Sequence, residues 1–130
     1  MSSPAPIADQ SGEYILRFIT ILPGLIFIAT GLIMQKFPAK HPNSFYGYRT
    51  STAMKSQEAW EAAQRIGSQE SIRLGLIQVI IGLLVGWTVA TEVFPVAYLL
   101  VSALACAIVL IMRTENQLRA LFPNGNVVKP

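Results

Sequence analysis

The feature that most constrains the fold is a set of three long apolar stretches, at residues 15–34, 72–89 and 95–112. A helix rises about 1.5 Å per residue, so each stretch is long enough to cross a hydrocarbon layer about 30 Å thick. The chain is 52% hydrophobic and only 13% charged, whereas a soluble domain carries about a quarter charged residues. The sequence therefore predicts an all-α integral membrane protein with three transmembrane helices.

The remaining segments are short, so a separate soluble domain has no room in 130 residues. We expect a single membrane domain over residues 1–130. Residues 1–14 are rich in Pro, Ser and Ala and are predicted to form a loose tail. Residues 35–71 form the only long connection between apolar stretches, and residues 113–130 form a polar tail after the last one.

The second half of the long connection, at about residues 56–67, has the apolar spacing of a short amphipathic helix. Trp60 and Ile66 belong to one face, and Glu61 and Arg65 are spaced to form an ion pair on another. Such a helix is typical of segments that lie in the membrane interface. We therefore expect it to lie flat on the bilayer with Trp60 inserted among the lipids.

Two features of the apolar stretches predict how the helices bend and pack. Pro23 and Gly24 lie inside the first stretch, where proline removes a backbone donor and favours a kink. Small residues and one amide recur on one side of the second stretch: Gly75, Gln78, Gly82 and Gly86. Small residues let helix backbones approach closely in lipid, and an amide is costly against acyl chains. This side is therefore expected to face another helix.

The basic residues predict the orientation. Every Lys and Arg except Arg17 lies in or beside the long connection or in the C-terminal tail. Because basic loops stay in the cytoplasm, the long connection and the C-terminus are predicted to be cytoplasmic, with the N-terminus outside. The net charge of +3 is then explained by topology and by anionic lipid, and the sequence carries no signature of nucleic-acid binding.

The segment 43–60, "NSFYGYRTSTAMKSQEAW", concentrates the candidate binding residues. Its aromatic rings suit the depth of lipid headgroups, its glycine permits a turn, and its arginine offers a planar fork of donors to a phosphate or carboxylate. The candidates are Asn43, Tyr46, Gly47, Tyr48, Arg49, Thr50 and Trp60. The alternative is structural: Arg49 bonds Glu58, Glu61 or backbone carbonyls, and Trp60 only anchors the helix.

Other chemistry finds little support in the sequence. His41 is the single histidine and has no nearby metal-ligand partners, so no metal site is expected. Cys106 is the single cysteine, lies within the third apolar stretch, and is interpreted as a packing residue. No nucleophile is paired with a base, so we expect neither enzymatic activity nor a cofactor.

The same segment carries a family resemblance. Asn43, the run Tyr46-Gly47-Tyr48-Arg49-Thr50, Lys55, Trp60, Ala63 and Gly67 resemble the fingerprint of the SdpI family of bacterial membrane proteins. The resemblance covers about residues 15–115. Family members often have Pro after the GYRT run and Asn four positions after the Trp, where this chain has Ser51 and Gln64. Founding members also carry additional spans ahead of this region.

The resemblance implies a function in the bacterial plasma membrane. It implies a non-enzymatic immunity protein that binds a membrane-active peptide toxin or a partner such as a regulator protein. Two alternatives stay open from the residues themselves. One is a protein that binds or processes lipid headgroups through Tyr46, Tyr48 and Arg49. The other is an accessory subunit whose glycine side docks on a larger membrane complex, and self-association into a homo-oligomer is also open.

Overall fold

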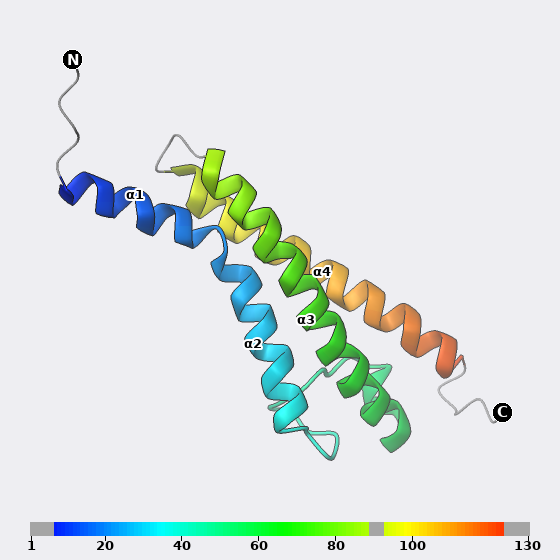
Figure 1. The fold of residues 1–130 in the computed structure, drawn as a ribbon. Helices are drawn as coiled ribbons and strands as arrows, with labels where there is room; N and C mark the ends of the chain where they lie inside the picture. The colour runs from blue at the N-terminus through cyan, green and yellow to red at the C-terminus, as the bar shows by residue number, and fades with distance from the viewer. Residues whose placement is uncertain (1–6, 89–92, 124–130) are drawn as a thin grey trace.

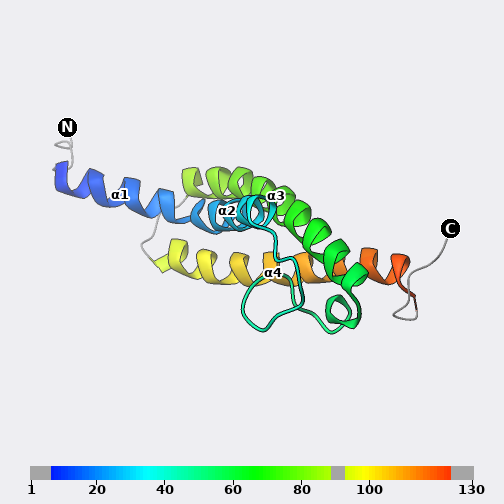
Figure 2. The same cartoon turned by 90° about the horizontal axis from the view of Figure 1, so that it is seen from below.

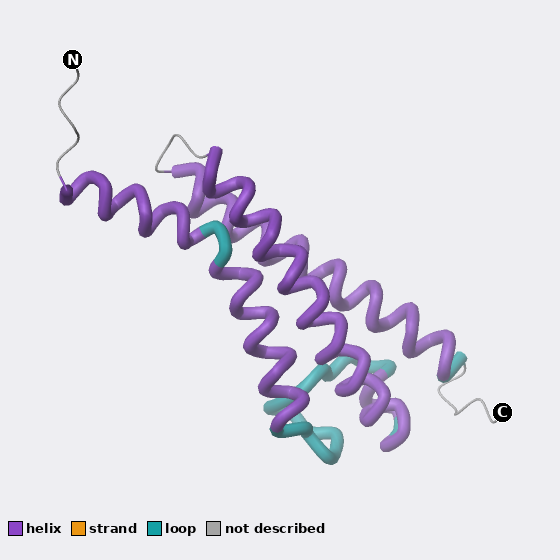
Figure 3. The backbone as a smooth tube through the Cα atoms, in the orientation of Figure 1, coloured by secondary structure: helices purple, strands orange, loops and turns teal. Residues whose placement is uncertain are grey.

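The computed structural model describes residues 7–88 and 93–123, and these residues form helices joined by loops (Figures 1 and 3). The elements in chain order are α1 (Ile7–Ile19), α2 (Leu22–Lys36), the 3-10 helix η1 (Ala53–Lys55), α3 (Gln57–Thr88) and α4 (Val93–Leu121). α3 packs between α2 and α4, whereas α1 projects away from the other helices (Figure 1). The predicted all-α class is confirmed.

Two helices have the length and composition of membrane spans. They are α3 (Gln57–Thr88) and Phe94–Leu121 in α4, and each contains an 18-residue stretch with the hydropathy of a span. A third crossing follows if α1 and α2 act as one bent span, since together they also pass this test. The structure therefore contains apolar helices of an integral membrane protein, and the number of crossings stays a prediction. The predicted turn between the last two spans lies mostly outside the described residues.

The first apolar stretch bends where proline predicted a kink. α1 and α2 meet at a break just before Pro23 and enclose a bend of 47°. Thr20, in the break, is fully buried, and its Oγ1 lies 2.7 Å from the carbonyl oxygens of both Arg17 and Gly82. The bend is thus held by a contact to α3 as well as by the missing proline donor.

The first helix starts earlier than the sequence indicated. α1 begins at Ile7, so the loose tail predicted for residues 1–14 is wrong for residues 7–14, which are helical. Glu13 and Arg17 lie one turn apart with their charged atoms 3.9 Å from each other, a spacing that supports a helix. The polar composition of this segment concealed an amphipathic helical period.

The predicted short helix at residues 56–67 is not a separate element. These residues, from Gln57, are the first turns of α3, which continues without interruption to Thr88. Residues 68–71, with the sequence Ser-Gln-Glu-Ser, are polar but contain neither Gly nor Pro, so nothing in the backbone ends the helix there. The prediction of a separate short interfacial helix in this connection was therefore wrong.

The glycines of α3 lie against the first two helices. A Cβ added to Gly75 would sit 2.7 Å from the carbonyl oxygen of Gly24, and one added to Gly86 would sit 2.7 Å from Thr20 Oγ1. At Gly82 an added Cβ would overlap the carbonyl group of Thr20. Backbones at this separation leave no space for a side chain, so the glycine side of α3 is occupied within the chain.

The buried apolar core lies at one end of the molecule. We call this end the headpiece: the loop 37–56, residues 57–68 of α3 and residues 113–122 at the end of α4. Figure 2 shows the loop crossing from the end of α2 past α4 to the start of α3. The core residues of the headpiece are Ala53, Ala59, Trp60, Ala62, Ala63, Ile66, Leu118 and Phe122. The headpiece is packed like a small soluble domain, whereas the long helices expose apolar side chains along their length.

Candidate functional site

The loop of the headpiece is shaped by its own side chains. Asn43 Oδ1 accepts hydrogen bonds from the backbone N–H groups of Phe45, at 2.9 Å, and Tyr46, at 2.8 Å. Its Nδ2 donates to the carbonyl oxygen of His41 at 3.0 Å. Tyr46 in turn donates its hydroxyl to the carbonyl oxygen of Phe37 at 2.9 Å. Asn43 therefore makes a turn of the kind that asparagine side chains favour, and Tyr46 fastens it to the end of α2.

Gly47 is required by both conformation and space. Its φ of 105° lies in the left-handed region, which side chains disfavour. A Cβ there would sit 2.5 Å from Gln64 Oε1 and 3.3 Å from Trp60 Cζ2. Gln64 pairs with the backbone of the next residue, because its Oε1 accepts the N–H of Tyr48 at 2.7 Å and its Nε2 donates to the Tyr48 carbonyl at 2.8 Å. Gln64 thus supplies an amide where the family fingerprint often has Asn.

Trp60 lies inside the headpiece. Its side chain is fully buried, and its Nε1 donates a hydrogen bond to the carbonyl oxygen of Ala39 at 2.7 Å. The prediction that this ring inserts among the lipids was therefore wrong. The loop folds over the apolar face of α3, so protein atoms cover the ring that the sequence pattern assigned to the bilayer. A fully buried indole is also closed to a ligand.

Glu115 of α4 binds the loop through three hydroxyl groups. Tyr48 donates to its Oε1 at 3.1 Å and Thr52 donates to its Oε2 at 2.7 Å. Thr50 donates a further short hydrogen bond to Oε1. Burial raises the pKa of Glu115, but these hydrogen bonds and the nearby Arg119 outweigh it and hold the pKa below its usual value. Sequence reasoning missed Glu115, because its partners lie in a distant part of the chain.

The carboxylate also affects Tyr48. Burial, and then the charge and hydrogen bond of Glu115, raise the pKa of the Tyr48 phenol well above its usual value. The phenol therefore stays protonated at all physiological pH values and remains a donor. Tyr48 and Thr50 of the GYRT run accordingly hold the loop on α4 through Glu115.

A buried carboxylate, that of Glu70, joins α3 to α4 near the start of the apolar segments. Glu70 is only 3% exposed and accepts from Arg113 Nε at 2.7 Å, Gln117 Nε2 at 3.1 Å and Arg73 at 3.1 Å. Burial raises its pKa, but the hydrogen bonds of Arg113 and Gln117 and the two positive charges lower it overall. This network explains why α3 continues through its polar stretch, since Glu70 is held inside the structure.

Arg49 remains at the surface. Its guanidinium donates to the carbonyl oxygen of Ser44 inside the same loop. In the described part of the chain it forms no ion pair with Glu58 or Glu61. Thr50 and Tyr48, by contrast, are committed to Glu115. The structure thus brings the predicted binding residues together in the headpiece, with Trp60 on α3 and the others in the loop, but most of them are used to hold that loop in shape.

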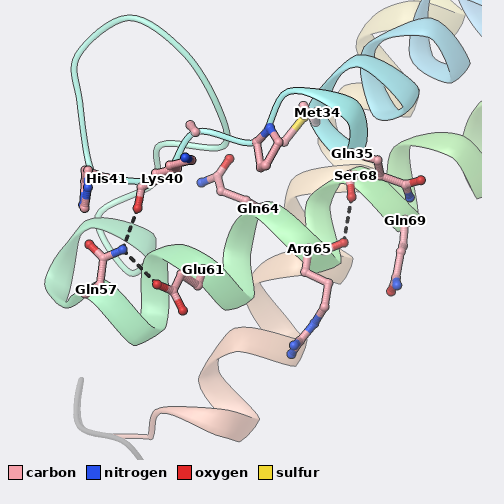
Figure 4. A pocket seen from close by; sticks show the side chains of 12 residues that line it. Met34, Gln35, Lys40, His41, Gln57, Glu61, Gln64, Arg65, Ser68 and Gln69 are labelled. Carbon is pink, nitrogen blue, oxygen red and sulfur yellow. Dashed lines mark hydrogen bonds between the residues drawn. The ribbon is translucent and has the colours of Figure 1, made fainter.

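A pocket of about 710 Å³ opens beside the headpiece, between the end of α2, the loop and the first half of α3 (Figure 4). Its volume lies in the range of small-molecule and peptide-side-chain sites, about 300–1,000 Å³. α2 contributes Met34 and Gln35, and the loop contributes Lys40 and His41. The largest share of the wall comes from polar side chains of α3. Sequence reasoning did not identify this pocket.

The α3 wall of the pocket is a polar stripe with a spacing of four residues: Gln57, Glu61, Arg65 and Gln69. All four are exposed. Gln57 Nε2 donates to the carbonyl oxygen of Lys40 at 2.6 Å and to Glu61 Oε1 at 2.9 Å. Among the described residues the predicted ion pair between Glu61 and Arg65 is not formed, and Glu61 bonds Gln57. The spacing was visible in the sequence and was the one signal that could have indicated this wall.

No group of His, Cys, Asp and Glu within residues 7–88 and 93–123 is arranged to hold a metal ion. The fold and site together define an all-helical membrane protein whose headpiece has a buried apolar core and an open pocket at its side. Residues 40–113 match the SdpI/YfhL protein family. The protein YfhL of Bacillus subtilis (strain 168) is 32% identical over 101 residues, which cover 78% of this chain and 86% of YfhL. The chain therefore belongs to the SdpI/YfhL family, and no solved structure matches it.

Proposed function

We propose that this protein is a non-enzymatic plasma-membrane protein that binds a membrane-active peptide or a partner protein in the pocket beside its headpiece. The observation that carries this proposal is the exposed stripe of Gln57, Glu61, Arg65 and Gln69 along a pocket of about 710 Å³. In this proposal the chain crosses the bilayer three times, with α1 and α2 as one bent span. The headpiece and the C-terminus are cytoplasmic.

The stripe is better suited to a ligand than the fingerprint loop. Tyr48 and Thr50 already donate to Glu115, and Trp60 is fully buried. The side chains of Arg65 and Gln69, in contrast, have no hydrogen bond or ion pair within the described residues. Groups that are solvated in the free protein can exchange water for ligand atoms without breaking the fold. In this proposal the residues of the family fingerprint hold the headpiece loop in shape, and the residues of the stripe contact the ligand.

The chemistry of the pocket favours a peptide. Amide side chains are both donors and acceptors, as is a peptide backbone, and Gln57 and Gln69 provide amides at the two ends of the stripe. At its membrane end the pocket borders Met34, and the neighbouring Ile33 of α2 is 51% exposed. An amphipathic peptide at the membrane surface could place its polar side on the stripe and its apolar side on α2.

A lipid headgroup is the second candidate, because Lys40, His41 and Arg65 all border the pocket. The positive charges of Lys40 and Arg65 would suit a phosphate. Docking of the glycine side on a larger complex is disfavoured, because α1 and α2 of the same chain already cover Gly75, Gly82 and Gly86.

The proposed topology predicts a one-sided labelling pattern. Ser51 is exposed on the headpiece, and Gln10 is exposed on α1. In a Cys106→Ser background, Ser51→Cys should resist a membrane-impermeant maleimide in intact cells and react after permeabilisation. Gln10→Cys should react in both conditions. Labelling of Ser51→Cys from outside would reverse the orientation and exclude a cytoplasmic pocket.

The proposed function predicts a loss of protection when the stripe is altered. Cells lacking the protein should be killed by lower doses of one or more purified membrane-permeabilising peptides. Arg65→Ala with Gln69→Ala should reproduce that sensitivity at unchanged protein level, with binding of the same peptide weakened about tenfold or more, as expected for the loss of a hydrogen bond to a charged group.

The matched control is Glu58→Ala, which removes an exposed charge on α3 outside the pocket. This variant should protect as well as the wild type. Equal survival of the deletion strain across the peptide panel would count against the immunity role. If a phosphate-bearing lipid co-purified instead and was lost with Arg65→Ala, the second candidate would replace the first.

A further inference from the structure

The surface of α4 is unusually open within the described chain. Only 11% of its apolar window is buried, against 28% for that of α3. Three large side chains form an exposed ridge along it, Val101 at 69%, Leu104 at 63% and Ile108 at 50%. Apolar exposure is ordinary for a helix in lipid, so the ridge alone implies no partner. The adjacent surface between α3 and α4 is different.

A groove of about 260 Å³ lies between α3 and α4, at the depth of the apolar segments. Its α4 wall is formed in part by Ser102, Ala105 and Val109, and Cys106 also lines it. Ser102 and Ala105 are small, and neither is buried by the chain itself, since Ala105 is exposed and Ser102 is half-buried. Small residues on an outer face let the backbone of another helix approach closely.

Gln78 of α3 lines the same groove. Its side chain is only 7% exposed, and its Nε2 has no hydrogen-bond partner in the part of the chain that the structure describes. An unpaired amide N–H costs free energy in a hydrocarbon environment. Rotation about the last side-chain bond, which is soft, can turn this N–H toward the groove. An acceptor that entered the groove would therefore be stabilised.

We propose that a second copy of this chain occupies the groove and forms a two-fold symmetric dimer through α4. A two-fold interface uses the same patch on both copies, so the patch must carry both a groove and a ridge that fits it. The patch meets this requirement, because each ridge residue directly precedes a wall residue. The pairs are Val101 and Ser102, Leu104 and Ala105, and Ile108 and Val109.

The chemistry of the groove also favours a helix over a lipid chain. Acyl chains carry no hydrogen-bond acceptor at this depth, so they would leave the Gln78 amide unpaired. A second α4 brings the hydroxyl of Ser102 and the backbone carbonyls near it. In the dimer each ridge fills the opposite groove, and each Gln78 N–H finds an acceptor in the other copy.

Disulfide crosslinking in native membranes tests the placement. In a Cys106→Ser background, Ala105→Cys should give a crosslinked dimer on mild oxidation. Leu25→Cys, on the lipid-exposed surface of α2, serves as the matched control and should stay monomeric. Absence of a crosslink at Ala105→Cys, or an equally strong one at Leu25→Cys, would overturn the proposal. A foreign polypeptide that copurifies one to one and blocks the Ala105→Cys crosslink would also overturn it.

Dimer affinity in lipid vesicles, measured by energy transfer between labelled copies, tests the role of the amide. Ala105→Leu should place a larger side chain in the groove, where the chain's own core is not disturbed, and abolish dimerisation. Gln78→Leu should weaken it about 10- to 400-fold, because it removes two symmetry-related hydrogen bonds and each contributes a factor of about 3 to 20 between membrane helices. Leu25→Ala should leave it unchanged. A wild-type chain that is monomeric at all protein densities, or a full-strength dimer in Ala105→Leu or Gln78→Leu, would refute the assignment.

Discussion

Replacing Trp60 by alanine is expected to open the headpiece while the long apolar helices remain in the bilayer. The ring is fully buried at the centre of the headpiece core, and its Nε1 donates to the Ala39 carbonyl at 2.7 Å. Removing a buried tryptophan costs about 3–5 kcal/mol, because packing contacts are lost and a cavity remains. The substitution also leaves the Ala39 carbonyl without its donor.

Hydrogen exchange of the backbone amides at residues 57–68, in lipid nanodiscs, measures this effect. A loss of about 3 kcal/mol or more should accelerate their exchange about 100-fold or more, while amides in the apolar half of α3 keep their protection. Phe45→Ala is the matched control, because this aromatic side chain is 92% exposed. If Trp60→Ala exchanged no faster than Phe45→Ala, Trp60 would not be the centre of the headpiece core.

The parts of the fold that sequence could predict are those set by local physics. Long apolar runs predict membrane helices, because only a helix satisfies its own backbone in hydrocarbon. Pro23 predicted the bend because its ring removes a donor wherever the helix runs. Neither the apolar runs nor Pro23 depend for these effects on what lies beside the segment.

The errors arose where a distant residue decides the structure. The sequence predicted a short helix at about residues 56–67 and a separate span from residue 72, but Glu70 between them is bonded by Arg113, which lies 43 positions further along the chain. In the same way, an amphipathic period shows that one face of residues 57–67 is apolar. It does not show whether lipid or protein covers that face, and the loop proves to cover Trp60.

The candidate site shows the same limit. The GYRT run contains groups that could bind a ligand, and the sequence cannot show that Glu115 already uses Tyr48 and Thr50. The type of a residue defines which interactions its side chain can make. Whether the side chain is available to a ligand depends on whether neighbouring residues already bond it. The four-residue spacing of the pocket stripe is visible in the sequence. Its significance depends on α2 and the loop, which form the opposite wall.

Replacing Glu115 by alanine is expected to release the loop from α4. The carboxylate accepts from Tyr48 at 3.1 Å, from Thr52 at 2.7 Å and from Thr50. A hydrogen bond to a charged group contributes about 1.5–3 kcal/mol. Because water can replace part of these bonds at the edge of the loop, we expect a total loss of about 3 kcal/mol in headpiece stability. Glu58→Ala, at an exposed position on α3, should change stability by less than about 0.5 kcal/mol.

The attachment of the loop to α4 through Glu115 should also weaken in acid. Hydrogen bonds hold the pKa of folded Glu115 below its usual value, so the unfolded headpiece takes up a proton more readily than the folded one. The stabilisation is complete above the ordinary carboxyl pKa, and it is lost as the pH falls toward the lowered pKa of the folded state. Glu70, whose pKa is also lowered, acts in the same direction.

Thermal unfolding of the headpiece, followed by Trp60 fluorescence in a Trp87→Phe background, isolates the contribution of Glu115. The stability difference between wild type and Glu115→Gln should be largest at neutral pH and should shrink as the solution is acidified, because the protonated wild-type carboxyl comes to resemble the amide. Glu58→Gln, at an exposed position on α3, should change stability at neutral pH much less than Glu115→Gln does. If the difference between wild type and Glu115→Gln were independent of pH, the ionised carboxylate would not be what holds the loop on α4.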